Sequence, residues 1–133
     1  MISAFDKEEA FPKLNFQFKP FGGRVLVQMR RIREKTASGI ILHTDTKEFN
    51  RNACQVGIVL ALGPLAYKDR DTRETWPEGV WCREGDMVRV PKYGGDRFLV
   101  PYEDDAIMFC VFLDHEILGG LSEEHVHLID DIL

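Results

Sequence analysis

Short apolar runs with the composition of β-strands alternate with polar stretches along most of the chain. Turn-forming Gly, Pro and acidic residues separate most of them, and the runs lie at residues 24–29, 56–62, 87–90, 98–100 and 106–113. The alternation of Leu14, Phe16 and Phe18 predicts one more short strand. Gly57, inside the second run, predicts a bulge or a close approach of two backbones. Short strands at this spacing predict an all-β barrel or sandwich.

One polar stretch is far longer than a turn. Residues 33–54, between the first two predicted strands, are mostly charged residues, Thr, Ser, Asn and Gly, with one aliphatic island of Ile40, Ile41 and Leu42. A loop of this length inside a compact domain is uncommon and is usually either functional or disordered. The island is therefore either a docking plug for another protein, or a short strand or flap that packs on the protein's own core.

Length and composition bound the class of protein. A chain of 133 residues fits one domain, and 44% hydrophobic with 29% charged residues is typical of a globular protein in water. No apolar run approaches the roughly 18 residues of a membrane span. The N-terminus carries acids where a signal peptide carries bases and then an apolar block. We therefore expect a cytoplasmic protein that makes no contact with a membrane.

The two signs of charge are segregated along the chain. The net charge is −5, yet residues 30–51 hold six basic residues against three acids, and no Lys or Arg follows Arg97. The net charge argues against a nucleic-acid-binding protein. One alternative nevertheless remains, a small barrel that binds single strands with the basic stretch and stacks bases on Phe16, Phe18 and Phe21.

Catalytic and metal-binding patterns are missing from the sequence. Cys54, Cys82 and Cys110 lie beside or within apolar runs, which is typical of buried free thiols. No Cys or His pair has the spacing of a strong metal site; His125 and His127 would share one face of a strand, but a solvated role in the acidic tail is the simpler interpretation. A phosphate-binding Gly-Lys-Ser/Thr motif is also missing. We expect no catalytic residue, no metal and no cofactor, and hence no enzyme.

The order of these segments resembles the GroES-type co-chaperonins, the small ring-forming lids of the chaperonin folding chamber. The matching segments are GRVLV (23–27), EKTASGIIL (34–42), QVGIVLALGP (55–64), EGDMV (84–88), PKYGG (91–95) and DHEILG (114–119). The resemblance implies a small GroES-like β-barrel domain at residues 21–121. It also implies an N-terminal extension at residues 1–20 and a C-terminal extension at residues 122–133.

Two parts of the family's barrel are placed by this resemblance. The mobile loop corresponds to residues 34–52 and the roof hairpin to residues 65–82, where no hairpin turn is evident. A divergent roof beside a retained loop is similar to the co-chaperonins of bacteriophages, which serve a bulky capsid protein. A related barrel occurs in zinc-dependent alcohol dehydrogenases, but those enzymes need a nucleotide domain and clustered zinc ligands that this chain does not have.

The function that the resemblance implies is that of a co-chaperonin. Its partners are a GroEL-type chaperonin ring, further copies of itself in a homo-heptamer, and an unfolded client enclosed in the chamber. ATP is bound by the partner chaperonin. The implied chaperonin-binding residues are Gly39, Ile40, Ile41 and Leu42, and the flanks of the mobile loop are Lys35, Thr36, Ala37, Ser38, His43 and Thr44.

Assembly into a ring needs edge strands. In the family the terminal strands of neighbouring subunits meet, which here implies edge strands at residues 21–26 and 116–121. The implied subunit-interface residues are Phe21, Arg24, Val25, Leu26, Ile117 and Leu118.

Overall fold

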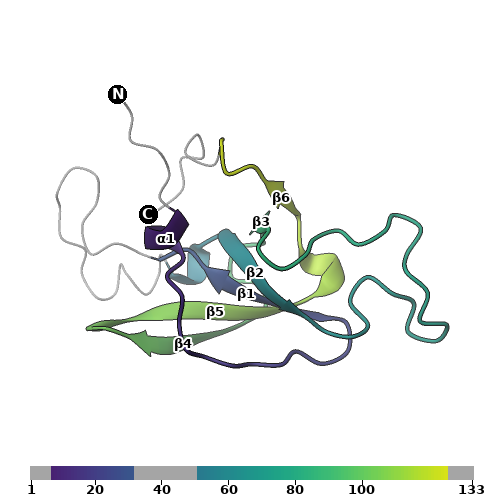
Figure 1. Cartoon of the computed structure of the whole chain (residues 1–133), viewed down its shortest axis with the longest axis horizontal. Coiled ribbons are helices and arrows are strands. Elements are labelled where there is room, and N and C mark those ends of the chain that lie inside the picture. Colours follow the sequence, from purple (N-terminus) through teal and green to yellow (C-terminus); the bar gives the residue numbers. More distant parts are fainter. Residues whose placement is uncertain (1–6, 32–50, 126–133) are drawn as a thin grey trace.

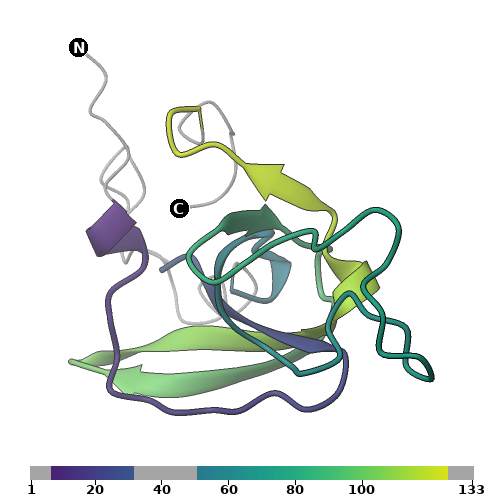
Figure 2. The same cartoon turned by 45° about the vertical axis from the view of Figure 1, so that its right-hand side comes forward.

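The computed structural model describes residues 7–31 and 51–125 of the chain (Figure 1). Within them, six antiparallel strands form one sheet in the order β4-β5-β1-β2-β3-β6. The elements are α1 (Lys7–Ala10), β1 (Arg24–Met29), β2 (Val56–Leu62), β3 (Met87–Arg89), β4 (Asp96–Tyr102), β5 (Asp105–Leu113), the 3-10 helix η1 (Asp114–Glu116) and β6 (Gly119–Leu121). The sheet curls around its core (Figure 2), which confirms the predicted all-β barrel. None of the helices in this part of the chain is long and apolar enough to cross a membrane.

Strand β1 lies in the middle of the sheet, with β5 on one side and β2 on the other. Its register with β2 shifts between Leu26 and Val27, so that Leu60 of β2 is the extra residue of a β-bulge. A Cβ atom on Gly57 would lie 3.0 Å from the backbone oxygen of Gln28 and 2.3 Å from Cγ1 of Val27, which leaves room only for glycine. The predicted close approach at Gly57 is therefore confirmed, and the bulge lies further along the same strand.

Both faces of β1 are buried. On one face, Val25 and Val27 pack in the main core cluster with Phe112. On the other face, Leu26 packs with Ile107 and Phe109 in a second cluster. A sheet buried on both faces needs a second covering layer, and the N-terminal segment supplies it.

The N-terminal segment crosses this second face as extended chain and runs along β4 and β5 before it enters β1 (Figure 1). The Phe16 ring lies 5.0 Å from the Phe109 ring, and Nε2 of Gln28 donates a buried hydrogen bond of 2.8 Å to the Pro12 carbonyl. The strand predicted at residues 14–18 is wrong. Residues 13–19 make no backbone–backbone hydrogen bond with a described strand, and the Phe16 ring packs on Phe109, so the segment lies on the face of the sheet. Its alternation reflects one-sided packing.

The three cysteines are buried and free, as predicted. Burial raises the pKa of each thiol, and that of Cys110 reaches about 12. At neutral pH all three are therefore protonated thiols that pack as small apolar groups.

Candidate functional site

The residues predicted to bind a chaperonin lie outside the described part of the chain. Gly39, Ile40, Ile41 and Leu42 and their predicted flanks, residues 35–38 and 43–44, all fall within residues 32–50. The structure describes the two points where this stretch joins the barrel, which we call the roots. One root is Arg31, after β1, and the other is residues 51–55, before β2. The Arg30 amide donates to the Val56 carbonyl at 3.0 Å, so the roots leave from neighbouring strands.

The second root is fixed by Arg97 of β4. Its guanidinium donates to four backbone carbonyl oxygens at 2.9 to 3.1 Å, those of Arg51, Cys54, Pro91 and Gly94. The Tyr93 amide adds a hydrogen bond of 3.0 Å to the Asn52 carbonyl. Arg51 and Asn52, which the sequence placed in the loop, thus belong to the folded barrel.

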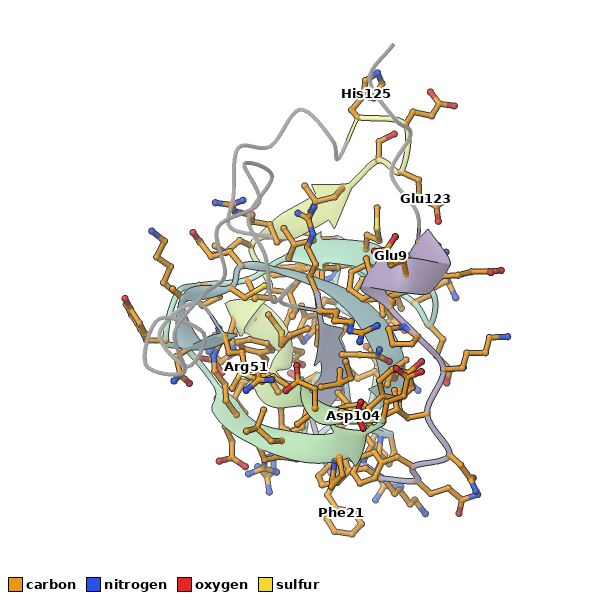
Figure 3. The ribbon with its side chains drawn as sticks, turned by 90° about the vertical axis from the view of Figure 1, so that its left-hand side faces the viewer. Glu9, Phe21, Arg51, Asp104, Glu123 and His125 are labelled. Atoms are coloured by element: carbon orange, nitrogen blue, oxygen red, sulfur yellow. The ribbon has the colours of Figure 1, made fainter. Side chains whose placement is uncertain are left out.

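The end of β4, the turn after it and the first residue of β5 contact both roots. Asp105 forms a 2.6 Å ion pair with Arg51, while Glu103 lies 3.8 Å from the guanidinium of Arg31. That guanidinium also sits 5.3 Å from the centre of the Tyr102 ring, within range of a cation–π contact. Figure 3 faces this end of the molecule and shows Arg51 and Asp104 on the same side of it. Two arginines of the basic stretch are therefore paired within the protomer.

The proposed nucleic-acid platform does not form as the sequence suggested. Phe16 packs on Phe109, and both Phe16 and Phe18 contact the Phe98 ring at about 6 Å, so these rings face the barrel. Phe21 is 69% exposed, but it is a single ring. Arg31 and Arg51 are paired and Phe16 packs in the barrel, so the rings left at the surface of the described residues for bases to stack on are Phe18 and Phe21.

The predicted interface residues divide into two groups. Val25 and Leu26 are buried, and the edge strand predicted at residues 21–26 is wrong because β1 is hydrogen-bonded on both sides. Ile117 is also buried, whereas Phe21, Arg24 and Leu118 are exposed. Which strand lies at an edge depends on the pairing of the whole sheet, which local sequence does not reveal.

Open backbone lies along β4 and β6, the two outermost strands of the described sheet, and along part of the N-terminal segment. β6 is an outermost strand of the described sheet, so the edge predicted at residues 116–121 is present at residues 119–121, whereas Glu116 belongs to η1. The extended residues 13–19 make no backbone–backbone hydrogen bond within the described part of the chain. An edge strand and an unpaired extended segment are the two components that β-strand addition between subunits requires.

Comparison with known proteins identifies the family. The family model of the chaperonin 10 kDa subunit matches residues 17–120. The chain belongs to this co-chaperonin family. It is 33% identical to the co-chaperonin GroES of Desulfotalea psychrophila over 103 residues, which cover 77% of this chain and 96% of the relative. It is 31% identical to the mitochondrial 10 kDa heat shock protein of Saccharomyces cerevisiae over 105 residues, which cover 79% of this chain and 89% of the relative.

A third relative is the co-chaperonin GroES of Rubrobacter xylanophilus, 33% identical over 108 residues that cover 81% of this chain and 99% of the relative. The family predicted from the sequence is thus confirmed. Co-chaperonins as a class are not catalytic. The relatives named here come from bacteria and yeast, and they give no support to a bacteriophage source.

The roof segment of this co-chaperonin does contain a hairpin. Lys68 and Thr75 form an antiparallel bridge, and the Asp69 amide donates to the Glu74 carbonyl at 2.7 Å. The Asp69 carboxylate accepts hydrogen bonds of 2.9 Å from the amides of Asp71 and Thr72. No hairpin turn was evident in the sequence of this segment, because Asp69 closes the turn with its side chain. The loop projects from the barrel (Figure 1).

An aromatic cluster fixes the base of this hairpin. Tyr67 is fully buried, and its ring lies 5.5 Å from Trp76 and 5.4 Å from Trp81. Its hydroxyl lies 3.2 Å from Sγ of Cys82, and its amide donates to the Asp114 carboxylate at 2.9 Å. Burial, together with the hydrogen bond to Cys82, raises the pKa of Tyr67 well above its usual value. The hairpin therefore projects from a packed base.

We expect the tip of the hairpin to loosen at acid pH. The amides of Thr72 and Asp71 lower the pKa of Asp69. A carboxylate with a lowered pKa stabilises the fold above its unfolded pKa, about 3.9, and this stabilisation is lost as the pH falls through the folded pKa. The measurement is an NMR titration of the Asp71 and Thr72 amide resonances. Asp69→Asn should abolish the titration, while Asp71→Asn should retain it; the reverse result would contradict the assignment.

Proposed function

We propose that this co-chaperonin assembles into a homo-heptameric ring and caps a GroEL-type chaperonin through residues 34–50 of each protomer. The capped chamber then supports ATP-dependent folding of an enclosed client in the cytoplasm, with ATP bound by the chaperonin. The observation that carries the proposal is the family match over residues 17–120. The two fixed roots support it, since they present residues 32–50 from one end of the barrel.

The proposed contact is the aliphatic island of Ile40, Ile41 and Leu42. Burying the three side chains in an apolar groove contributes roughly 5 to 9 kcal/mol before costs. Ordering the residues around them costs about 1 to 2 kcal/mol for each residue, which offsets most of that gain. One loop should therefore bind weakly, and the loops of a ring should bind tightly together because each raises the effective concentration of the next.

The proposed contact between protomers joins the open edge of β6 to residues 13–19 of a neighbour. Both stretches have backbone groups without a backbone partner within the described chain, and strand pairing in a closed ring would satisfy part of each. Phe21 and Leu118, at 69% and 62% exposed, are the apolar side chains available to such an interface. Three other residues predicted at the interface are buried in the core, so they support the interface only indirectly: Val25, Leu26 and Ile117.

Co-sedimentation with a chaperonin double ring tests the proposal. We expect this protein to sediment with the double ring when nucleotide is present and to remain in the supernatant without it. Sedimentation velocity of the protein alone, at the same concentration, should show one species of about seven protomers. Failure to sediment with the chaperonin in either nucleotide state would contradict the capping role.

A further inference from the structure

We propose that the open edge of β6 binds residues 13–19 of a neighbouring copy as an antiparallel strand, and that opposite charges beside this pair select the partner. The inference rests on the proposed ring and names the register and the charge contact of its interface, Glu124 with the neighbour's Lys13. The family model matches residues 17–120, so both charged residues lie in parts of the chain that the family match does not cover.

β6 has open space on both of its faces as well as along one edge. A Cβ atom on Gly119 or on Gly120 would meet no heavy atom within 4 Å in the described part of the chain. One edge of β6 pairs with β3, and the other edge pairs with no described strand. Glycine inside a strand is typical of a site that another backbone approaches closely. β6 is therefore a strand with room for a second chain.

Residues 13–19 present a polar face that is positively charged. Leu14 and Phe16 are half-buried against the sheet. The alternate residues are exposed, namely Lys13, Asn15, Gln17 and Lys19. No acid occurs from residue 10 to residue 23, and neither lysine forms an ion pair within the described ranges. The outer face of this segment therefore favours an acidic partner.

The chain after β6 supplies an acidic partner. Residues 122–133 hold no Lys or Arg, and Glu123 and Glu124 are both exposed. Glu123 forms a 2.5 Å ion pair with Lys7 of the same chain, whereas Glu124 forms none among the described residues. The Glu124 amide donates to the Ser122 hydroxyl at 3.3 Å, in a turn at the surface. Glu124 is therefore the acid available to a second copy.

The ion pair of Lys7 with Glu123 also sets the direction of pairing. Residues 13–19 lead away from α1, whereas the chain after β6 returns to it (Figure 1). Rotation about an axis along both segments keeps these opposite directions in a neighbouring copy, so the pair is antiparallel. Lys13 and Glu124 then lie at the same end of the pair.

Two exposed apolar side chains fix the register. Pairing of Gly120 with Gln17 places Leu118 opposite Lys19. Phe21 is then the diagonal neighbour of Leu118, and diagonal neighbours lie about 7 to 8 Å apart, within reach of an aromatic side chain. Leu118 and Phe21 are 62% and 69% exposed in the protomer, so this register covers both. Parallel pairing would separate them.

Cysteine cross-linking tests the register in the full-length protein. Gln17→Cys combined with Gly120→Cys should form disulfides between protomers under mild oxidation and give a ladder of linked chains on a non-reducing gel. The three native cysteines are buried and have raised thiol pKa values, so they react slowly. Asn15→Cys with Gly120→Cys is the matched control. It should give no ladder, because diagonal Cα atoms lie beyond the roughly 7 Å that a disulfide spans.

Charge exchange tests the choice of partner. Lys13→Glu and Glu124→Lys should each raise the protein concentration at which half of the rings dissociate by about threefold, as expected for the loss of one exposed ion pair at each contact. The double variant restores a pair of opposite charges and should return to within about 1.5-fold of wild type. Lys92→Glu makes the same change at an exposed lysine outside both segments, and its rings should dissociate like those of wild type. Sedimentation velocity over a range of concentrations is the measurement.

The outcomes separate the ring from the contact that holds it together. A wild type that forms no ring contradicts the proposed function. Wild-type rings, with no ladder from Gln17→Cys combined with Gly120→Cys, overturn the register and with it the inference. Rings of Lys13→Glu that dissociate at the wild-type concentration overturn the inference as well, because the charges would then not select the partner.

Discussion

Ile41→Asp is expected to abolish binding to the nucleotide-bound chaperonin and to leave the ring intact. The change forfeits about 1.5 to 3 kcal/mol of apolar burial, and an unpaired carboxylate in an apolar groove costs several kcal/mol more. A loss of about 4 kcal/mol corresponds to roughly a thousandfold for one loop, and the loss multiplies over the ring. Co-sedimentation with the double ring and refolding of a chaperonin-dependent client are the measurements.

The control for Ile41→Asp is Thr46→Asp, which adds the same charge to the same segment outside the aliphatic island. We expect it to bind with a Kd within a few-fold of wild type. Sedimentation velocity should show both variants as rings, since neither position belongs to β6 or to residues 13–19. Refolding of the client at the wild-type level by Ile41→Asp would refute the assignment of the island as the contact.

The barrel could be predicted from the sequence because its strands are continuous apolar runs between turn residues. β1 and β2 begin and end within a residue of the predicted runs, since a strand buried on both faces is apolar at nearly every residue. The N-terminal segment misled the same reasoning. Alternation of apolar and polar residues indicates an extended chain with one buried side. It does not distinguish a hydrogen-bonded strand from an extended segment that lies on the face of a sheet.

The candidate site could be predicted only in part, because sequence patterns reveal local features and not contacts between distant residues. An aliphatic island in a polar loop is a local feature, and Ile40 to Leu42 stand out from composition alone. The contacts of Arg97 join residues up to 46 positions apart, and no local pattern encodes them. Edge strands are likewise not encoded by a local pattern. The sequence predicted β1 as an edge strand at the interface, but β1 is paired on both sides and lies inside the sheet.

Phe11→Ala is expected to lower the free energy of unfolding by about 3 to 5 kcal/mol, the usual cost of removing a buried Phe side chain. Phe11 is 6% exposed and packs with Val56, Ile58 and Met87, so it belongs to the barrel although it lies in the N-terminal extension. Urea denaturation at a fixed protein concentration measures the change. Phe18→Ala is the matched control: it removes the same side chain from a site that is 40% exposed, and it should cost about 1 kcal/mol or less.

Phe11→Ala should also weaken the contact between protomers in the ring. Leu121 of β6 packs against the Phe11 cluster, so a cavity there removes support from the strand proposed to pair with a neighbour. We expect Phe11→Ala rings to dissociate at higher protein concentration than wild-type rings in sedimentation velocity. If Phe11→Ala loses stability but its ring dissociates at the wild-type concentration, β6 is positioned by β3 alone, and the N-terminal extension only stabilises the protomer.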